Sequence, residues 1–155
     1  MKKYIIFLLS LFSILLVSQV SYSQIKSDLN LEKGDVAVGG YDPVSYFENK
    51  VEKGDRHITT VYQGAHYYFV SQKHLEAFKA SPQKYSPAYG GWCAYAMGAK
   101  GDKVDVNYET YKIQNGRLFL FYNKFFSNTL EDWEEEGAER LEKQADKNWK
   151  KYLAQ

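Results

Sequence analysis

The chain has 155 residues, a formal net charge of +1 and a single cysteine. Its length favours one domain, and 45% hydrophobic with 25% charged residues argues against wholesale disorder and against a polytopic membrane protein. One cysteine excludes an intrachain disulfide framework and a metal cluster with several cysteine ligands. A net charge this close to neutral does not indicate the basic surface that nucleic-acid-binding proteins usually carry. The unusual value is an aromatic content of 17%, from 14 Tyr, 9 Phe and 3 Trp.

The first segment has the pattern of a secretory signal peptide. Two lysines precede an apolar run over residues 5–17, and Ser21-Tyr22-Ser23 supplies a small-x-small cleavage pattern, which predicts a leader over 1–23. An uncleaved anchor is the alternative, but the run is shorter than the roughly 20 residues of a membrane span. We therefore expect an exported protein, periplasmic or extracellular, with no stable membrane anchor after cleavage. Cleavage removes both lysines and changes the net charge from +1 to −1.

The mature chain is expected to form a lead-in over 24–38, which shows no clear period, and a single domain over 39–155. Asp42 followed by proline predicts the start of a short helix over Pro43–Phe47, because these residues suit the N-cap and the first helical position. Lys53-Gly54-Asp55 has the composition of a turn.

An antiparallel pair of strands and a helix are expected next. Ile58–Tyr62 is rich in β-branched residues, Gln63-Gly64 suits a tight turn, and His66–Val70 is aromatic and strand-like. Ser71 then predicts the cap of a helix over Gln72–Ala80, with its apolar residues spaced to face inward.

The clearest hairpin signal lies further along the chain. Residues 92–97 suit a short helix or a buried turn, and Thr110–Gln114 and Arg117–Tyr122 flank Asn115-Gly116, a pair typical of a type I′ turn. The second strand is apolar on both faces, which predicts a central strand covered on both sides.

The C-terminal segment over 128–153 has a helical apolar stripe, with Asn128 or Thr129 as the cap. Gly137 is expected to kink this helix or to split it into two. Acidic residues come first and lysines last, which fits the dipole of a single helix. The chain as a whole predicts an α+β fold: a small antiparallel sheet, short helices, and a long C-terminal helix or helix pair.

Four motifs in this order resemble the YHS domain in its longer, exported form. They are Gly40-Tyr41-Asp42-Pro43-Val44, the stretch from Tyr62-Gln63-Gly64 to Tyr67-Tyr68-Phe69-Val70-Ser71, Phe78-x-x-Ser81-Pro82-x-x-Tyr85, and Tyr89-Gly90-Gly91-Trp92-Cys93-Ala94. The resemblance runs from about Gly39 to Tyr122. It implies a small α+β module for which metal binding is the usual inference, since related domains occur in heavy-metal transport ATPases and beside bacterial multicomponent monooxygenases.

The metal-type version of that family is similar to this chain except at its three cysteine positions. Those positions hold Ser45, Val70 and His74 here. The resemblance leaves His74 as a possible ligand, while Cys93 belongs to the longer form of the domain.

Cys93 is the best single candidate for chemistry. If its segment is helical, Cys93 and Met97 share a face, and a thiolate with a thioether suits Cu(I). With His74 as the third ligand, these residues form the candidate copper site. The alternative is a purely structural role, in which Cys93 is a small buried apolar side chain and Met97 fills space in the core. Cys93 and His74 could also form a nucleophile–base pair, but no local signal supports activation, and we expect a non-enzymatic protein.

Aromatic residues crowd the same motifs as the cysteine. They supply a candidate ligand-binding set of Tyr41, Tyr68, Tyr89, Trp92 and Tyr95. These rings either line a pocket for a planar or apolar ligand or form a hydrogen-bonded tyrosine core. The leading expectation is an exported binding module for a soft metal ion, copper first. The alternative is a metal-free domain that binds a small organic ligand or a protein partner through a tyrosine-lined pocket.

Overall fold

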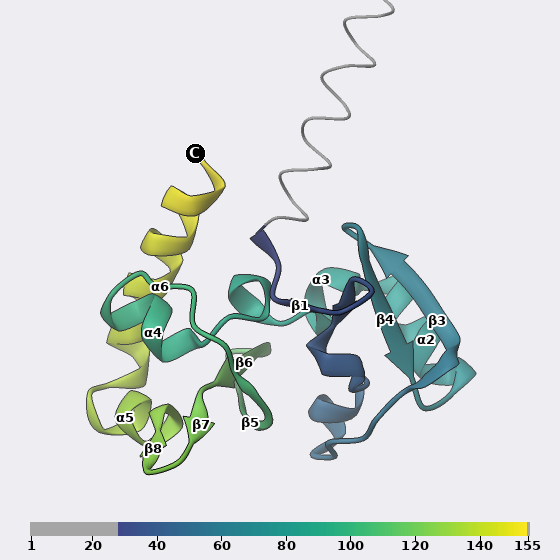
Figure 1. Cartoon of the computed structure of the whole chain (residues 1–155), viewed down its shortest axis with the longest axis horizontal. Helices are drawn as coiled ribbons and strands as arrows, with labels where there is room; N and C mark the ends of the chain where they lie inside the picture. The colour runs from purple at the N-terminus through teal and green to yellow at the C-terminus, as the bar shows by residue number, and fades with distance from the viewer. Residues whose placement is uncertain (1–27, 155) are drawn as a thin grey trace, which may run out of the picture.

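The computed structural model describes residues 28–154, so the predicted signal peptide lies outside the described residues. The fold is α+β, as predicted (Figure 1). The strands are β1 (Leu31–Glu32), β2 (Val36–Ala37), β3 (Asp55–Tyr62), β4 (Ala65–Phe69), β5 (Asn107–Gln114), β6 (Arg117–Phe121), β7 (Asn123–Lys124) and β8 (Ser127–Asn128). The helices are η1 (Val38–Gly40), η2 (Ser45–Glu48), α2 (Gln72–Ala80), α3 (Pro82–Tyr85), η3 (Ala88–Gly91), α4 (Ala94–Ala99), α5 (Thr129–Glu135) and α6 (Ala138–Leu153).

The first half of the molecule, from β1 to α3, contains the expected hairpin and helix, and the second half runs from η3 to α6. β3 and β4 pair antiparallel around Gln63-Gly64, whose φ angles of 51° and 80° are both positive. α2 has the predicted bounds, and the side chain of Ser71 accepts a hydrogen bond from the backbone N–H of His74. The cap and the turn, both local signals, are therefore confirmed.

Three expectations for this half need correction. Residues of the predicted lead-in form β1 and β2, and β2 pairs with β4 in parallel, so the sheet is not wholly antiparallel. The helical turn after Asp42 is a 3₁₀ turn over Ser45–Glu48 that begins two residues late. Gly54 is not in a turn, since a Cβ there would meet the backbone of Tyr68, and its lack of a side chain permits a close chain crossing.

β6 separates two hydrophobic cores. Its leucines, Leu118 and Leu120, join the core of the first half with residues such as Tyr46 and Phe69. Its phenylalanines, Phe119 and Phe121, point to the other face and join a second core. The strand is covered on both faces, as predicted, but it belongs to a two-stranded sheet with β5 and is not the centre of a larger one.

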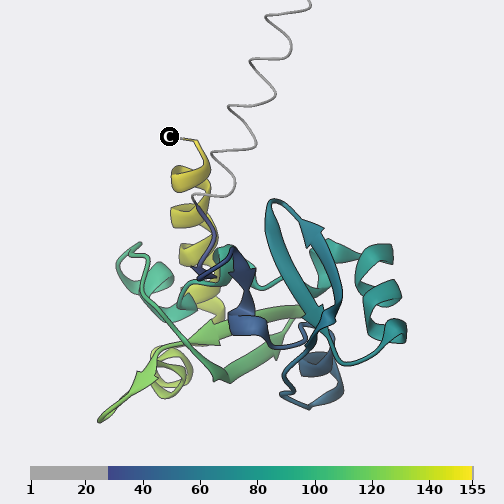
Figure 2. The ribbon, with the colours of Figure 1, turned by 45° about the vertical axis from the view of Figure 1, so that its right-hand side comes forward.

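The second core is enclosed mainly by helices. It contains Tyr89, Ala94, Met97, Phe119, Phe121, Trp133, Leu141 and Ala145. The C-terminal segment is split, because Gly137, with φ of 97°, separates α5 from α6. Turning the molecule shows α6 standing beside the β5–β6 hairpin, away from β3 and β4 (Figure 2). None of the helices in residues 28–154 combines the length and apolar content needed to span a membrane.

Candidate functional site

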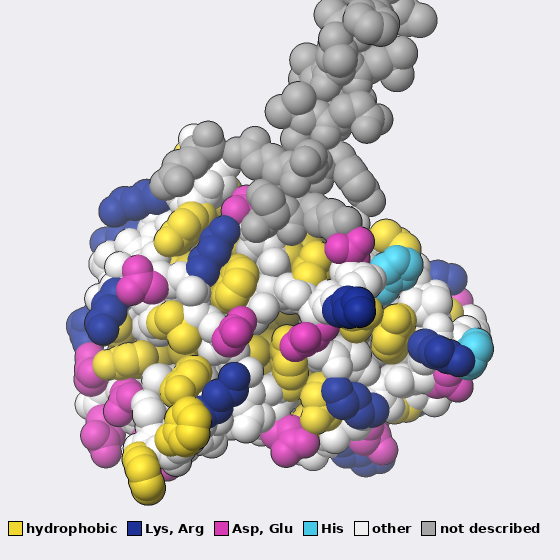
Figure 3. Space-filling view, in the orientation of Figure 1, with side chains coloured by type: hydrophobic (Ala, Val, Ile, Leu, Met, Phe, Trp, Pro, Cys, Tyr) yellow, Lys and Arg dark blue, Asp and Glu magenta, His cyan; other side chains and the backbone are white. Residues whose placement is uncertain are grey.

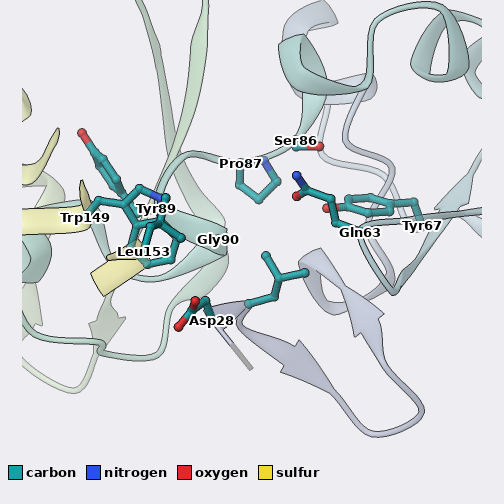
Figure 4. Close-up of a pocket in the computed structure, with 10 residues that line it drawn as sticks. Asp28, Gln63, Tyr67, Ser86, Pro87, Tyr89, Gly90, Trp149 and Leu153 are labelled. Atoms are coloured by element: carbon teal, nitrogen blue, oxygen red, sulfur yellow. The ribbon is translucent and has the colours of Figure 1, made fainter. Parts of the chain in front are cut away.

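A cleft of about 450 Å³ lies between the two halves (Figure 4). One side carries Gln63 and Tyr67 from the β3–β4 hairpin, and the other carries Trp149 and Leu153 from α6. The remaining described lining residues are Asp28, Leu29, Ser86, Pro87, Tyr89 and Gly90. Trp149 and Leu153 are four residues apart, so they share one helix face. The cleft therefore has aromatic and aliphatic walls with a few polar groups.

Tyr89 is held in a strained conformation beside this cleft. Its φ is 54°, which is unusual for a bulky residue, and the residue is only 2% exposed. Its hydroxyl lies 3.0 Å from Asp146 Oδ1 and 3.3 Å from the backbone oxygen of Glu142. Burial is the main reason that the pKa of Tyr89 lies above its ordinary value. Strain of this kind is concentrated at functional sites and persists only where the surroundings impose it.

Arg117 completes the polar support behind Tyr89. Its guanidinium lies 2.9 Å from Glu142 Oε1 and 3.0 Å from Asp146 Oδ1, and 5.3 Å from the centre of the Tyr89 ring. Burial acts to lower the pKa of Arg117, but the hydrogen bonds and charges of Asp146, Glu142 and Tyr89 together outweigh it and the pKa is raised. The group is thus permanently charged and orients the tyrosine.

The segment at the start of the described chain forms the lower wall. The side chain of Trp92 donates to the backbone oxygen of Asp28 at 2.7 Å, and the Asp28 carboxylate lies 2.8 Å from Lys103 Nζ. Gly90 makes room for this segment, because a Cβ there would lie 2.9 Å from the Asp28 backbone oxygen and 3.1 Å from Trp149. A glycine is therefore required where the wall meets α6.

A second hollow of about 270 Å³ continues from the cleft. It shares Gln63, Ser86, Pro87, Tyr89 and Trp149 with the cleft and adds Tyr62, Gln83, Ala88 and Arg117. Burial raises the pKa of Tyr67 to about 12, so this hydroxyl remains a neutral donor at physiological pH. Together the hollows present rings, two amide side chains and hydroxyl groups to an occupant.

His74 lies in a different place, in the first half of the molecule. Its Nδ1 is 2.7 Å from Oδ2 of the fully buried Asp42, and its Nε2 is 3.4 Å from Glu48 Oε1. Asp42 also accepts backbone hydrogen bonds from Val44 and Val70, both at 2.8 Å. The imidazole thus ties α2 to the segment around Asp42.

Cys93 is fully buried near the boundary between the two cores. Its Sγ accepts a hydrogen bond from the backbone N–H of Tyr122 at 3.4 Å and lies 3.3 Å from Thr129 Oγ1. The Thr129 hydroxyl donates to the Tyr122 backbone oxygen, which leaves the thiol as donor to Thr129. A cavity of about 290 Å³ lies beside it, and no histidine is among the described residues that line it.

The structure does not bring the three candidate copper ligands together. Cys93 precedes α4, with φ of −56° and ψ of 119°, so it does not share a helix face with Met97. The two side chains belong to different cores. His74 is on α2, which lies across the molecule from α4 in both ribbon views (Figures 1 and 2). Among residues 28–154, no group of three or more His, Cys, Asp or Glu side chains is arranged to hold a metal ion.

Of the five candidate ligand-binding aromatics, Tyr89 lines the cleft and Trp92 supports its wall. Tyr95 borders the cavity beside Cys93 and donates to Glu136 at 2.6 Å. Tyr41 donates to Glu109 elsewhere, and Tyr68 packs against Gly40.

Sequence reasoning missed the part played by α6 in the cleft. Trp149 and Leu153 continue the same apolar stripe as the buried Leu141 and Ala145. The stripe extends beyond the core, and its spacing gives no sign of where the core ends.

Comparisons of the chain with protein-family models, curated proteins and solved structures found no match. The resemblance to the YHS domain therefore stays a prediction.

Proposed function

We propose that this protein is a non-enzymatic, exported binding module that holds a planar, mainly apolar organic group in the cleft between its two halves, without a metal. The observation that carries the proposal is the cleft itself, with rings on both sides and a volume of about 450 Å³. Small-molecule sites are typically concave, largely apolar and of roughly 300–1,000 Å³, with a few polar groups that orient the ligand.

The chemistry of the lining supports binding rather than catalysis. Its described members include no cysteine or histidine, and the carboxylate of Asp28 is paired with Lys103. Trp149 and Pro87 offer flat surfaces for stacking, whereas Gln63 and Ser86 offer hydrogen bonds to the edge of a ring. The tie between Tyr89 and Asp146 holds one wall in place, which lowers the ordering cost of binding.

The test uses anilinonaphthalene sulfonate, an anion with a flat, apolar naphthalene ring system, as the probe. We expect saturable one-to-one binding, seen as enhanced probe fluorescence and as a change in tryptophan emission. Leu153→Ser removes an exposed apolar wall residue and is expected to weaken binding at least tenfold. Val61→Ser is the matched control, because Val61 is equally exposed, at 54%, but lies outside the cleft.

Two results would overturn the proposal. One is an absence of saturable binding by a protein that is shown to be folded. The other is equal binding by the Leu153→Ser and wild-type proteins, which would place the probe elsewhere. Trp149→Phe provides a second check that keeps a ring in the wall, and it should retain most of the affinity.

A further inference from the structure

The short hairpin of β7 and β8 carries two phenylalanines at its tip, Phe125 and Phe126. They are 95% and 107% exposed. Apolar side chains project from the same end of the molecule in the space-filling view (Figure 3). Phe125 also has a φ of 58°, a conformation that a bulky residue rarely adopts. The aromatic pair therefore adds nothing to either core and costs backbone strain.

The other two-residue turns of the chain show what the fold alone requires. Gln63-Gly64 and Asn115-Gly116 each contain a glycine, in keeping with their positive φ angles. At 125–126 the chain holds aromatic rings where turn formation alone favours glycine or asparagine. The two phenylalanines are therefore explained by contact with another molecule and not by the needs of the turn.

The helix beside the tip is mainly acidic and the helix beside the cleft is mainly basic in its later turns, although the tip hairpin itself also carries the exposed Lys124. α5, directly after the hairpin, and the residue that follows it carry Glu131, Asp132, Glu134, Glu135 and Glu136 and no lysine or arginine. From Lys143 to its end, α6 carries the exposed residues Lys143, Lys147, Lys150 and Lys151, and its last turns border the cleft. The dipoles of the two separate helices favour Glu131 and Asp132 in the first turn of α5 and Lys150 and Lys151 in the last turn of α6. Glu134, Glu135, Glu136, Lys143 and Lys147 lie outside those turns, so the dipoles do not account for them.

The tip and the cleft lie at opposite ends of α6. The hairpin is beside the start of this helix, whereas Trp149 and Leu153 are near its C-terminal end (Figures 1 and 2). The tip of one molecule therefore does not reach its own cleft. Projection at one end and a hollow at the other suit contacts between separate molecules.

We infer that the Phe125–Phe126 tip of one molecule inserts into the cleft of a second copy, so that the chain is its own partner. This rests on the proposed function, because it takes the cleft as a site for planar apolar groups and names the group. The rings pack against Trp149 and Leu153, and the acidic α5 of one copy faces the lysines of α6 in the other. The contact is heterologous, joining different surfaces of the two copies.

Sedimentation velocity over a range of protein concentrations tests this inference. The average mass is expected to rise with concentration, with a dissociation constant on the order of 100 μM for so small an interface. The double variant Phe125→Ser, Phe126→Ser should weaken association at least tenfold, and so should Leu153→Ser. High salt should weaken it as well, because the facing charges are exposed.

A mixing experiment gives the decisive result. The tip variant retains an intact cleft, and the Leu153→Ser variant retains an intact tip. Each alone should be monomeric, whereas an equimolar mixture should form dimers containing one chain of each kind. Association of the Leu153→Ser variant at wild-type strength would indicate tip-to-tip contact and would overturn the inference.

Two other outcomes would also overturn it. One is a wild-type protein that is monomeric at every concentration. The other is a monomer that binds zwitterionic phosphatidylcholine vesicles through the tip, which would make lipid the occupant. The tip variant should still bind anilinonaphthalene sulfonate, since its cleft is unchanged. If it does so while the wild type remains monomeric, only the self-association fails and the proposed function stands.

Discussion

The two halves on either side of β6 are both held by carboxylates, but these carboxylates lie in different surroundings. In the first half, Asp42 is fully buried and accepts hydrogen bonds from two backbone amides and from His74. In the second half, Asp146 and Glu142 share Arg117. The side chains of Asp146 and Arg117 are 42% and 37% exposed, and the buried Glu142 has further donors in the amides of Gln114 and Asn115. An enclosed acceptor has no water to replace it, whereas a half-exposed pair does. The first half therefore depends on one residue, and the second distributes its stability.

Asp42→Ala should have the largest effect. It leaves the backbone N–H groups of Val44 and Val70 and the imidazole of His74 without their acceptor, and we expect a loss of about 3 kcal/mol in the free energy of unfolding. Urea denaturation measures it. Asp55→Ala, at an exposed aspartate of β3 that accepts one hydrogen bond from the backbone N–H of His57, is the control and should cost less than about 1 kcal/mol. Similar costs for the two variants would remove the proposed asymmetry.

The helical packing of the second half should respond to Gly98→Ala. A Cβ at Gly98 would lie 2.7 Å from the backbone oxygen of Leu141, so α4 must move away from α6. We expect a loss of about 2 kcal/mol, as for other overpacked sites. The sign of the change in the free energy of unfolding is informative. Alanine is normally the better helix former by about 1 kcal/mol, so without the close contact this substitution would stabilise the protein. A stabilised variant would show that the two helices are not in close contact.

Arg117→Met tests the ion pairs that Arg117 shares with Glu142 and Asp146 in the second half. When the guanidinium is lost, the half-exposed Asp146 can be hydrated, and the buried Glu142 keeps the amide donors of Gln114 and Asn115, so we expect a cost of about 1 kcal/mol. The cost should shrink in high salt, which screens half-exposed pairs. Denaturation at two salt concentrations is the measurement. A salt-independent loss as large as that of Asp42→Ala would contradict the comparison.

Tyr67→Phe should have the smallest effect at neutral pH. Burial raises the pKa of Tyr67 to about 12 from the ordinary 10.0, so the folded state holds the proton more tightly than the unfolded state. Its contribution is complete below pH 10 and is lost as the pH rises towards 12, at up to about 1.4 kcal/mol per pH unit. The variant should therefore lose less stability than the wild type over this interval. Parallel alkaline unfolding curves would count against the burial of this hydroxyl.

Sequence reasoning succeeded where a signal is local. The Ser71 cap, the Asn115-Gly116 turn and the break at Gly137 each depend on a few adjacent residues with known backbone preferences. The same reasoning failed where distant segments meet. The pairing of His74 with Asp42 crosses 32 positions, and nothing in the residues around either one indicates the other.

The candidate site residues also divide into features that nearby sequence indicates and features that only the tertiary structure produces. Tyr89 was selected because it lies in an aromatic motif, but that motif indicates neither its φ of 54° nor the contacts of its hydroxyl with Glu142 and Asp146 on α6. The grouping of Cys93, Met97 and His74 rested on ligand chemistry alone. Their side chains are directed by the start of α4 and by the two sides of β6, which depend on the tertiary structure.

The position of β6 has a consequence for folding. Because leucines cover one face and phenylalanines the other, a shift of one residue in its pairing with β5 would exchange the side chains delivered to the two cores. Such a slip would overfill one core and leave voids in the other. The register of this single strand therefore determines the packing of both cores. For this reason we expect the molecule to unfold as one cooperative unit.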